Sequence, residues 1–579
     1  MPHGLWVGVD TWNVLFADNG ELARWLSFAE LTRIGLLNRS FKCMFERALG
    51  FLWRSRSAAC ARAELSHTVG CVVRFGQTEH VRILMPLLVR AAEAGGGAGG
   101  GKSVVPYLFD AIREGHAEVV GALLEIGGPE LPMSDSGESC LTVVVRHERV
   151  EILGVLARAM LDMDFYKLLL MPCLSNIDYS DMSCLHYSVY RGDPVMVKAL
   201  LRAADRVWGR LCVMELTTDS GYTCLHMAAE CCLLPRGFEV VQALLKAAGS
   251  AFQTKLLMRR SGPGDSCLAI AASVGSVDTV KALLEAAGPA RRELLMLTNL
   301  VGDSCLHASV EEGRVATTCA LLEAAGPARR ELLMLRNAAG DSCLHVCVKE
   351  GCVDVARALL EAAGDWRREL LMLTDAWGNS CLHVCVMGAG MNPSRDFDPG
   401  GGRQLMPMPQ NTCLYASVNE MRVNVVRALL EAAGDWRREL LMLQCHYGKS
   451  CLYLSVMMGN LTLTNALLEG AGDDAPELVM VSRTMGGTCL HISAMFSCEH
   501  LMMALLEAAG PRRRELLIQQ SCSGMTVLHI ASYSTRKDFV QVLLEAAGEH
   551  KSELLLIPDY GIDLSSFSER EISLCKVLC

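Results

Sequence analysis

Apolar residues recur along most of this chain in short blocks with helical spacing, and the blocks themselves repeat at a fixed interval. One block, residues 302–335, reads GDSCLHASVEEGRVATTCALLEAAGPARRELLML. The tetrapeptide SCLH, TCLH or a degenerate copy opens each block, and Cys267, Cys305, Cys343 and Cys381 follow one another at 38-residue intervals. Such a period is typical of stacked supersecondary units.

Each block predicts two antiparallel helices and a short third one. Ser304 precedes an apolar-periodic segment, so its hydroxyl is a suitable N-cap for the N–H groups of the first turn. The first helix then ends at Gly313 and the second at Gly326. The remaining PARRELLML begins with a proline, which suits a first helical position, and it predicts a short extra helix before an extended turn.

This pattern resembles the ankyrin repeat, whose signature is T-P-L-H, a glycine six residues beyond the histidine, and then L-L-x-x-G. Residues 304–307 match T-P-L-H with cysteine in place of proline, and Gly313 lies six residues past His307. Leu321 and Leu322 lie eight and nine residues past Gly313, as the family requires. The resemblance implies an all-α, ankyrin-type repeat solenoid of about 12 repeats with a helical N-terminal cap.

The repeats divide the chain into six predicted parts. These are a helical segment at 1–60, a degenerate capping repeat with a Gly-rich linker at 61–103, a first arm of repeats at 104–386, a Gly/Pro-rich loop at 387–410, a second arm at 411–562 and a C-terminal cap at 563–579.

The loop at 387–410 interrupts one repeat. It follows SCLHVCV and contains five glycines and four prolines, a composition that cannot hold an α-helix. We therefore expect this repeat to lack its second helix and its stacking interface to be thinner than the others. A hinge or an exposed loop is predicted between Pro393 and Pro409.

Composition and charge exclude several classes of function. The net charge is −10 and no basic block is longer than three residues, so we expect no nucleic-acid partner. No stretch approaches the ~20 apolar residues of a membrane span, and the N-terminus does not read as a secretion signal. We expect an intracellular, cytoplasmic protein.

The stretch GGAGGGKS at 96–103 has the spacing of a phosphate-binding loop. That motif requires a buried strand before it and a helix after it, whereas here both flanks read as repeat helices. A flexible linker is the favoured interpretation, no cofactor is predicted, and a nucleotide hydrolase that uses Lys102 is the remote alternative.

The recurrent cysteines and histidines suggest core and capping roles. Equivalent cysteines of successive repeats are expected ~8–10 Å apart, too far for a disulfide, so we expect buried, reduced thiols. The histidines lack the local ligand pairs of zinc sites, and no metal or catalytic site is predicted. The family resemblance implies that their rings bond near the N-cap and the adjoining turn.

Partner contacts are expected on the fingers, which are the connecting turns between repeats, and on the exposed ends of first helices. These candidates are Asn299, Leu300, Asp375 and Trp377 in the fingers, and Glu311, Glu312, Lys349 and Glu350 at the helix ends. Two DWRREL segments add Trp366, Arg367, Arg368, Trp436, Arg437 and Arg438. Tryptophan and arginine are enriched at interface hot spots, although a solvated helix face with each arginine paired to the adjacent glutamate is the simpler interpretation.

Residues 21–56 belong to no repeat and are similar to the second half of an F-box, a module that docks on cullin-type ubiquitin ligases. The candidate adaptor-docking residues are Leu26, Leu31, Ile34, Leu37, Phe41 and Trp53. The predicted function is a non-catalytic scaffold for protein–protein interaction. A ubiquitin-ligase substrate receptor is the alternative, with this segment recruiting the ligase and the array choosing the substrate.

Overall fold

The computed structural model describes residues 58–93, 104–127, 133, 138–160, 162–172, 181–205, 210–388, 413–482, 487–496, 498–521, 524–533 and 537–557. The chain divides into two compact units, Met1–Pro263 and Gly264–Cys579. Four predicted features lie outside the described residues: the F-box-like segment 21–56, the GKS motif with Lys102, the hinge at 393–409, and the C-terminal cap.

The first unit contains five helix pairs within its described residues. They are α4 (Ala58–Arg74) with α5 (Thr78–Glu93), α6 (Val105–Glu114) with α7 (Ala117–Gly127), α8 (Cys140–Arg146) with α9 (Val150–Ala159), α11 (Cys184–Tyr190) with α12 (Pro194–Asp205), and α14 (Cys224–Glu230) with α15 (Gly237–Leu257). Short helices α10 (Asp162–Leu170) and α13 (Arg210–Met214) follow two of them. In α15 the backbone bends at Gly249, where φ is 67°, so its last turns correspond to a third helix.

The second unit contains seven helix pairs within its described residues. They are α16 (Cys267–Val274) with α17 (Val277–Ala287), α19 (Cys305–Glu311) with α20 (Val315–Ala325), α22 (Cys343–Glu350) with α23 (Val353–Ala363), α25 (Cys381–Met387) with α26 (Cys413–Ala433), α28 (Cys451–Met457) with α29 (Leu461–Ala471), α31 (Cys489–Met495) with α32 (Glu499–Ala508), and α34 (Val527–Tyr533) with α35 (Lys537–Ala547). First helices pack on first helices and second on second, as predicted for a solenoid.

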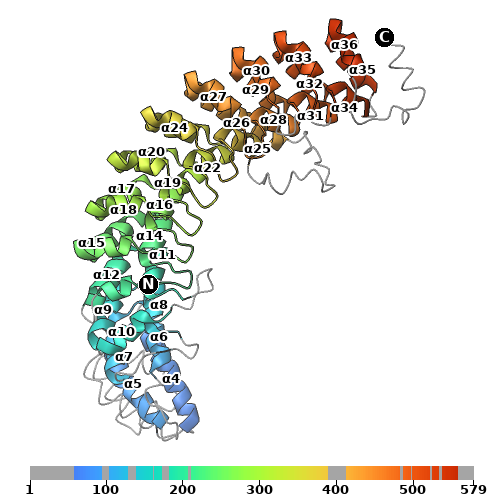
Figure 1. Ribbon diagram of the computed structural model, residues 1–579. Coiled ribbons are helices and arrows are strands. Elements are labelled where there is room, and N and C mark those ends of the chain that lie inside the picture. The colour runs from blue at the N-terminus through green and yellow to red at the C-terminus, as the bar shows by residue number, and fades with distance from the viewer. Residues whose placement is uncertain are drawn as a thin grey trace, which may run out of the picture. The chain divides into compact units, whose positions relative to one another are not determined.

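Each second helix of this unit leads through a 3-10 turn into a short third helix, which the RRELL sequences predicted in five of the seven repeats. These third helices are α18 (Arg291–Leu295), α21 (Arg329–Leu333), α24 (Arg367–Leu371), α27 (Arg437–Met442), α30 (Ala475–Met480), α33 (Arg513–Ile518) and α36 (Lys551–Leu556). In this unit they form the outer row of Figure 1, and the first helices lie on the opposite side. Their leucines, such as Leu332 and Leu333, are fully buried.

The SCLH residues begin each first helix and attach it to the following turn. In α19, the Oγ of Ser304 accepts from His307 N, while His307 Nδ1 accepts from Ser304 N at 3.3 Å, which forms a reciprocal cap. The other ring nitrogen donates to the Asp341 carbonyl of the next turn at 3.3 Å. Cys305 Sγ lies 3.6 Å from the Leu295 carbonyl and is fully buried. The predicted capping and core roles are confirmed.

One prediction about the repeats is wrong. The repeat that begins with α25 does not lack a second helix, because α26 packs against α25 and α25 packs directly on α28. The TCLY copy at 412 does not open a separate repeat, since α26 runs unbroken from Cys413 to Ala433 and its second half occupies the second-helix position. The segment after Met387 is therefore an insertion within one repeat, with stacking continuous across it. The expected hinge at 393–409 lies outside the described residues.

Candidate protein-interaction surface

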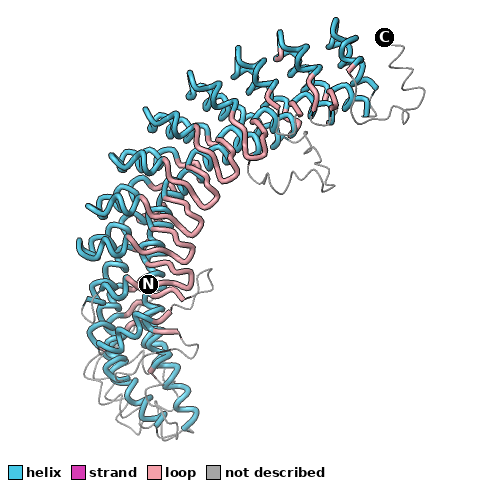
Figure 2. The backbone as a smooth tube through the Cα atoms, viewed as in Figure 1, coloured by secondary structure: helices cyan, strands magenta, loops and turns pink. Residues whose placement is uncertain are grey.

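Three fingers of the second unit are tight turns held by the side chain of their first residue. In residues 299–303, Asn299 Oδ1 accepts from Val301 N at 3.1 Å and from Asp303 N at 2.9 Å, and the Asn299 N–H donates to the Asp303 carbonyl. Residues 337–341 repeat this arrangement with Asn337, and residues 375–379 repeat it with Asp375. These loops, and the equivalent residues 445–449, are the fingers that project from the helices in Figure 2. A side-chain acceptor at the first position thus fixes the shape of the three turns that begin at Asn299, Asn337 and Asp375.

Backbone hydrogen bonds join each finger to the next one. Ala338 N donates to Val301 O at 2.9 Å, Ala376 N to Ala339 O at 3.1 Å, and His446 N to Trp377 O at 3.0 Å. Four consecutive fingers therefore form one continuous edge rather than four independent loops.

Side chains at the finger bases form a second ladder, which stops at Asp341. Asn299 Nδ2 donates to Asp265 Oδ1 and Asn337 Nδ2 donates to Asp303 Oδ1, both at 2.9 Å. The next finger carries Asp375 where the two preceding fingers carry asparagine, and its Oδ2 accepts from Asn379 of the same finger. Unlike an asparagine amide, the Asp375 carboxylate has no N–H group that could donate a hydrogen bond to Asp341.

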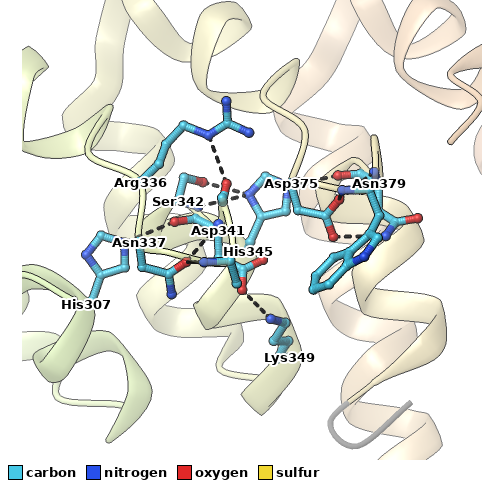
Figure 3. Close-up of polar contacts among 12 residues, drawn as sticks. His307, Arg336, Asn337, Asp341, Ser342, His345, Lys349, Asp375 and Asn379 are labelled. Atoms are coloured by element: carbon cyan, nitrogen blue, oxygen red, sulfur yellow. Dashed lines mark hydrogen bonds and ion pairs between the residues drawn. The ribbon is translucent and has the colours of Figure 1, made fainter. Parts of the chain in front are cut away.

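Asp341 takes a different partner at this break. Its Oδ2 binds Lys349 Nζ at 2.5 Å, while its buried Oδ1 has no hydrogen-bond partner in the structure. Figure 3 shows Lys349 reaching up from the first helix to Asp341 at the finger base. Lys349 is the sixth residue after Cys343, the cysteine of SCLH, so a side chain at this position faces the finger. Glu311 holds the equivalent position in the preceding repeat.

The predicted finger contacts separate into two kinds. Asn299 is half-buried and Asp375 is 5% exposed, and both use their side-chain oxygens to hold the turn. Leu300 is 77% exposed at the tip of its finger, and Trp377 is half-buried. Val301 and Tyr447, which the sequence did not single out, are 57% and 41% exposed. Their place two residues after the turn-holding position is the signal that could have found them.

The predicted helix-end residues differ in whether they form ion pairs. Glu311, Glu312 and Glu350 are exposed, and none of them has an ion-pair partner among the described residues. Partial burial, together with the carboxylates of Asp303, Glu350 and Glu312, raises the pKa of Glu311. Lys349 is the exception, because Asp341 neutralises it.

The first arginine of each RRELL segment closes the end of the second helix. Arg367 Nε donates to the Leu360 carbonyl at 3.0 Å and Arg437 Nε to the Leu430 carbonyl at 3.2 Å. Arg291, Arg329 and Arg513 make the same contact seven residues back. These bonds satisfy carbonyls that a helix end leaves open, so this arginine is structural.

The second arginine links neighbouring repeats. Arg368 Nη2 contacts both carboxylate oxygens of Glu439 at 3.0 and 2.9 Å, and Arg438 contacts both oxygens of Glu477 at 2.7 Å. The same pairing joins Arg292 to Glu331, Arg330 to Glu369 and Arg514 to Glu553. Each arginine thus pairs with the glutamate of the next repeat, not with the adjacent glutamate as the sequence suggested.

Trp366 and Trp436 lie on the same outer row and are 37% and 38% exposed. Because the insertion lies between them in the chain, these tryptophans occupy equivalent positions in consecutive repeats. The arginines beside them are committed to carbonyls and carboxylates of the array itself.

Residues 268–369 match the family model for ankyrin repeats, in three copies. This chain contains ankyrin repeats. Among solved structures, it is similar to the crystal structure of the ankyrin repeat domain of Bcl-3, a member of the IkappaB family, at 19% identity. The TM-score is 0.37, and the match covers 48% of this chain and 98% of that one. The sequence matches no curated protein.

None of the described helices has the length and apolar character that crossing a membrane requires. No cluster of three or more histidine, cysteine, aspartate or glutamate side chains within the described ranges is arranged to hold a metal ion.

Proposed function

We propose that this ankyrin repeat protein is a non-catalytic scaffold that binds partner proteins through the fingers and first-helix ends of its second unit. Ankyrin repeats are a protein–protein interaction module, and a stacked array offers an extended surface on this side. An intracellular location and a ligase-receptor role through residues 21–56 stay predictions.

A difference between the two sides of the array carries the proposal. On the outer row, Glu331, Glu369 and Glu439 each have an arginine from the preceding repeat. On the finger side, Glu311, Glu312 and Glu350 have no ion-pair partner among the described residues, and apolar side chains are exposed at the finger tips. Groups left without internal partners are the ones available to another protein.

An affinity pull-down with the intact chain tests the proposal. The double variant L300S/V301S removes apolar contact area at a finger tip without changing charge, and it should lose the captured partners. The matched control W366A/W436A alters exposed aromatic residues on the outer row and should retain them. If the control loses the partners and the finger variant keeps them, the interaction face is the outer row and the proposal is wrong.

A further inference from the structure

The finger edge of the second unit carries no aspartate, glutamate, lysine or arginine at its tips over four consecutive repeats. The pairs of tip residues are Leu300-Val301, Ala338-Ala339, Ala376-Trp377 and His446-Tyr447. Leu300, Val301 and Tyr447 are each more than 40% exposed. Since backbone hydrogen bonds join these fingers, the tips form one continuous edge of mainly apolar residues.

Two of these repeats carry negative charge at the ends of their first helices, where Glu311, Glu312 and Glu350 have no ion-pair partner among the described residues. Glu311 faces the finger base, because Lys349, which holds the equivalent position one repeat later, reaches Asp341 there. Partial burial of the Glu311 carboxyl raises its pKa, and so do its acidic neighbours Asp303, Glu350 and Glu312. These carboxylates therefore repel one another and are not offset within the described part of the chain.

Several cationic side chains of these repeats already have partners within the array. Lys349 is paired with Asp341, Arg336 Nε donates to the Gly340 carbonyl at 2.8 Å, and Arg314 Nε donates to the Ser273 carbonyl at 3.0 Å. Lys449 is buried at the base of its finger. In the described part of the chain, none of these cations forms an ion pair with Glu311, Glu312 or Glu350.

We propose that this surface binds a basic amphipathic segment of a partner protein. Lysine or arginine side chains of the segment lie against Glu311, Glu312 and Glu350, and its apolar side chains lie on the tips at Leu300, Val301, Trp377 and Tyr447. The inference rests on the proposed function and names the chemistry of the partner.

Charge complementarity favours this occupant over the others. An acidic segment or a nucleic acid would bring further negative charge to carboxylates that already repel one another. A purely apolar segment would cover the finger tips. It would also remove water from the nearby carboxylates without giving them a hydrogen-bonding or ionic partner, which costs free energy. A segment with both characters satisfies the two parts of the surface.

Selection from a random peptide library displayed on phage tests the inference. With the intact chain as bait, the enriched peptides should combine a lysine or arginine cluster with apolar residues. Their affinity for E311Q/E312Q/E350Q should fall about tenfold or more, and the loss should shrink at high salt because the contacts are ionic. The control E285Q/E323Q/E361Q makes the same change of charge on exposed second-helix positions and should bind within twofold of the parent.

The outcomes separate this inference from the proposed function. Enriched peptides that are acidic or lack basic residues, or equal losses in the two triple variants, overturn the inference. Peptides whose binding is lost only in W366A/W436A overturn it as well, although they leave a protein-binding array. A library that yields no enriched peptide also counts against the inference, while partners lost from L300S/V301S in the pull-down would still support the function.

Discussion

His383 Nε2 lies 2.9 Å from the carbonyl oxygen of Lys449, although 66 residues separate the two in the chain. In neighbouring repeats the same bond spans 34 residues, as from His307 to Asp341 and from His345 to Asn379. The difference of 32 residues is the length of the insertion. The bond from His383 is equivalent to those from His307 and His345. The stacking of first helices and fingers therefore continues across the insertion.

The insertion should therefore be removable. Deleting residues 390–421 restores the 38-residue spacing from Cys381 to Cys451. The deletion removes the bond between Asn419 and Asn460, which contributes about 1 kcal/mol, so we expect a small loss of stability and an intact array. Hydrogen exchange should show α25 and α28 as protected as in the parent. Loss of protection in both helices would mean that the insertion holds the two parts of the array together.

The Asp341 break in the finger ladder can be tested by exchanging two residues. In D375N/N379D the third finger acquires the Asn…Asp pattern of residues 299–303, so the new asparagine can donate to Asp341 Oδ1, which lacks a partner. Because D375N/N379D and N379D carry the same new buried carboxylate, we expect the double variant to exceed N379D by about 1 kcal/mol in the free energy of unfolding, measured by urea denaturation. The single variant N379D places two carboxylates in one finger and should be destabilising. Equal stability of the double variant and N379D would contradict the ladder.

The two arginines of one third helix should differ in their effect on stability. R367A removes a half-buried guanidinium from the Leu360 carbonyl and should cost about 1–2 kcal/mol. R368A breaks an exposed pair with Glu439 and should cost less than about 1 kcal/mol, with a smaller effect at high salt. Thermal unfolding at two salt concentrations measures both. A larger loss in R368A than in R367A would show that the inter-repeat ladder matters more than the cap.

Stability should fall as the pH drops below the ordinary pKa of histidine. Burial lowers the pKa of His186 and of His383 from 6.5 to about 4, because removal from water disfavours the charged ring, and the hydrogen bonds to the Tyr222 and Lys449 carbonyls offset only part of this effect. With a depressed folded pKa, each ring's contribution is complete above pH 6.5 and is lost as the pH falls towards 4. The limiting loss is about 3 kcal/mol for each ring.

Urea midpoints at pH 7.5, 5.5 and 4.5 measure this dependence. H383Q removes one titrating ring, so its stability should change less with pH than that of the parent. An unchanged slope would show that His383 is not the buried neutral ring described here.

The sequence predicted the regular parts of the fold because each signal is local. Ser304 and His307 lie within one helical turn, and the third helices begin where RRELL follows a glycine. It failed at α26 because TCLY resembles a helix start. In the structure no glycine or proline interrupts residues 413–433, so one helix runs through. The partner of Arg368 could not be predicted, since Glu439 becomes its neighbour only when the repeats stack.

The finger side of the second unit can be tested most directly by hydrogen exchange of the intact chain, with and without a partner captured in the pull-down. Binding should slow exchange in the fingers 299–303, 337–341, 375–379 and 445–449 and at the ends of α19 and α22, and it should leave α21, α24 and α27 unchanged. Protection confined to those third helices, with the fingers exchanging at the same rate in both states, would contradict the proposed surface.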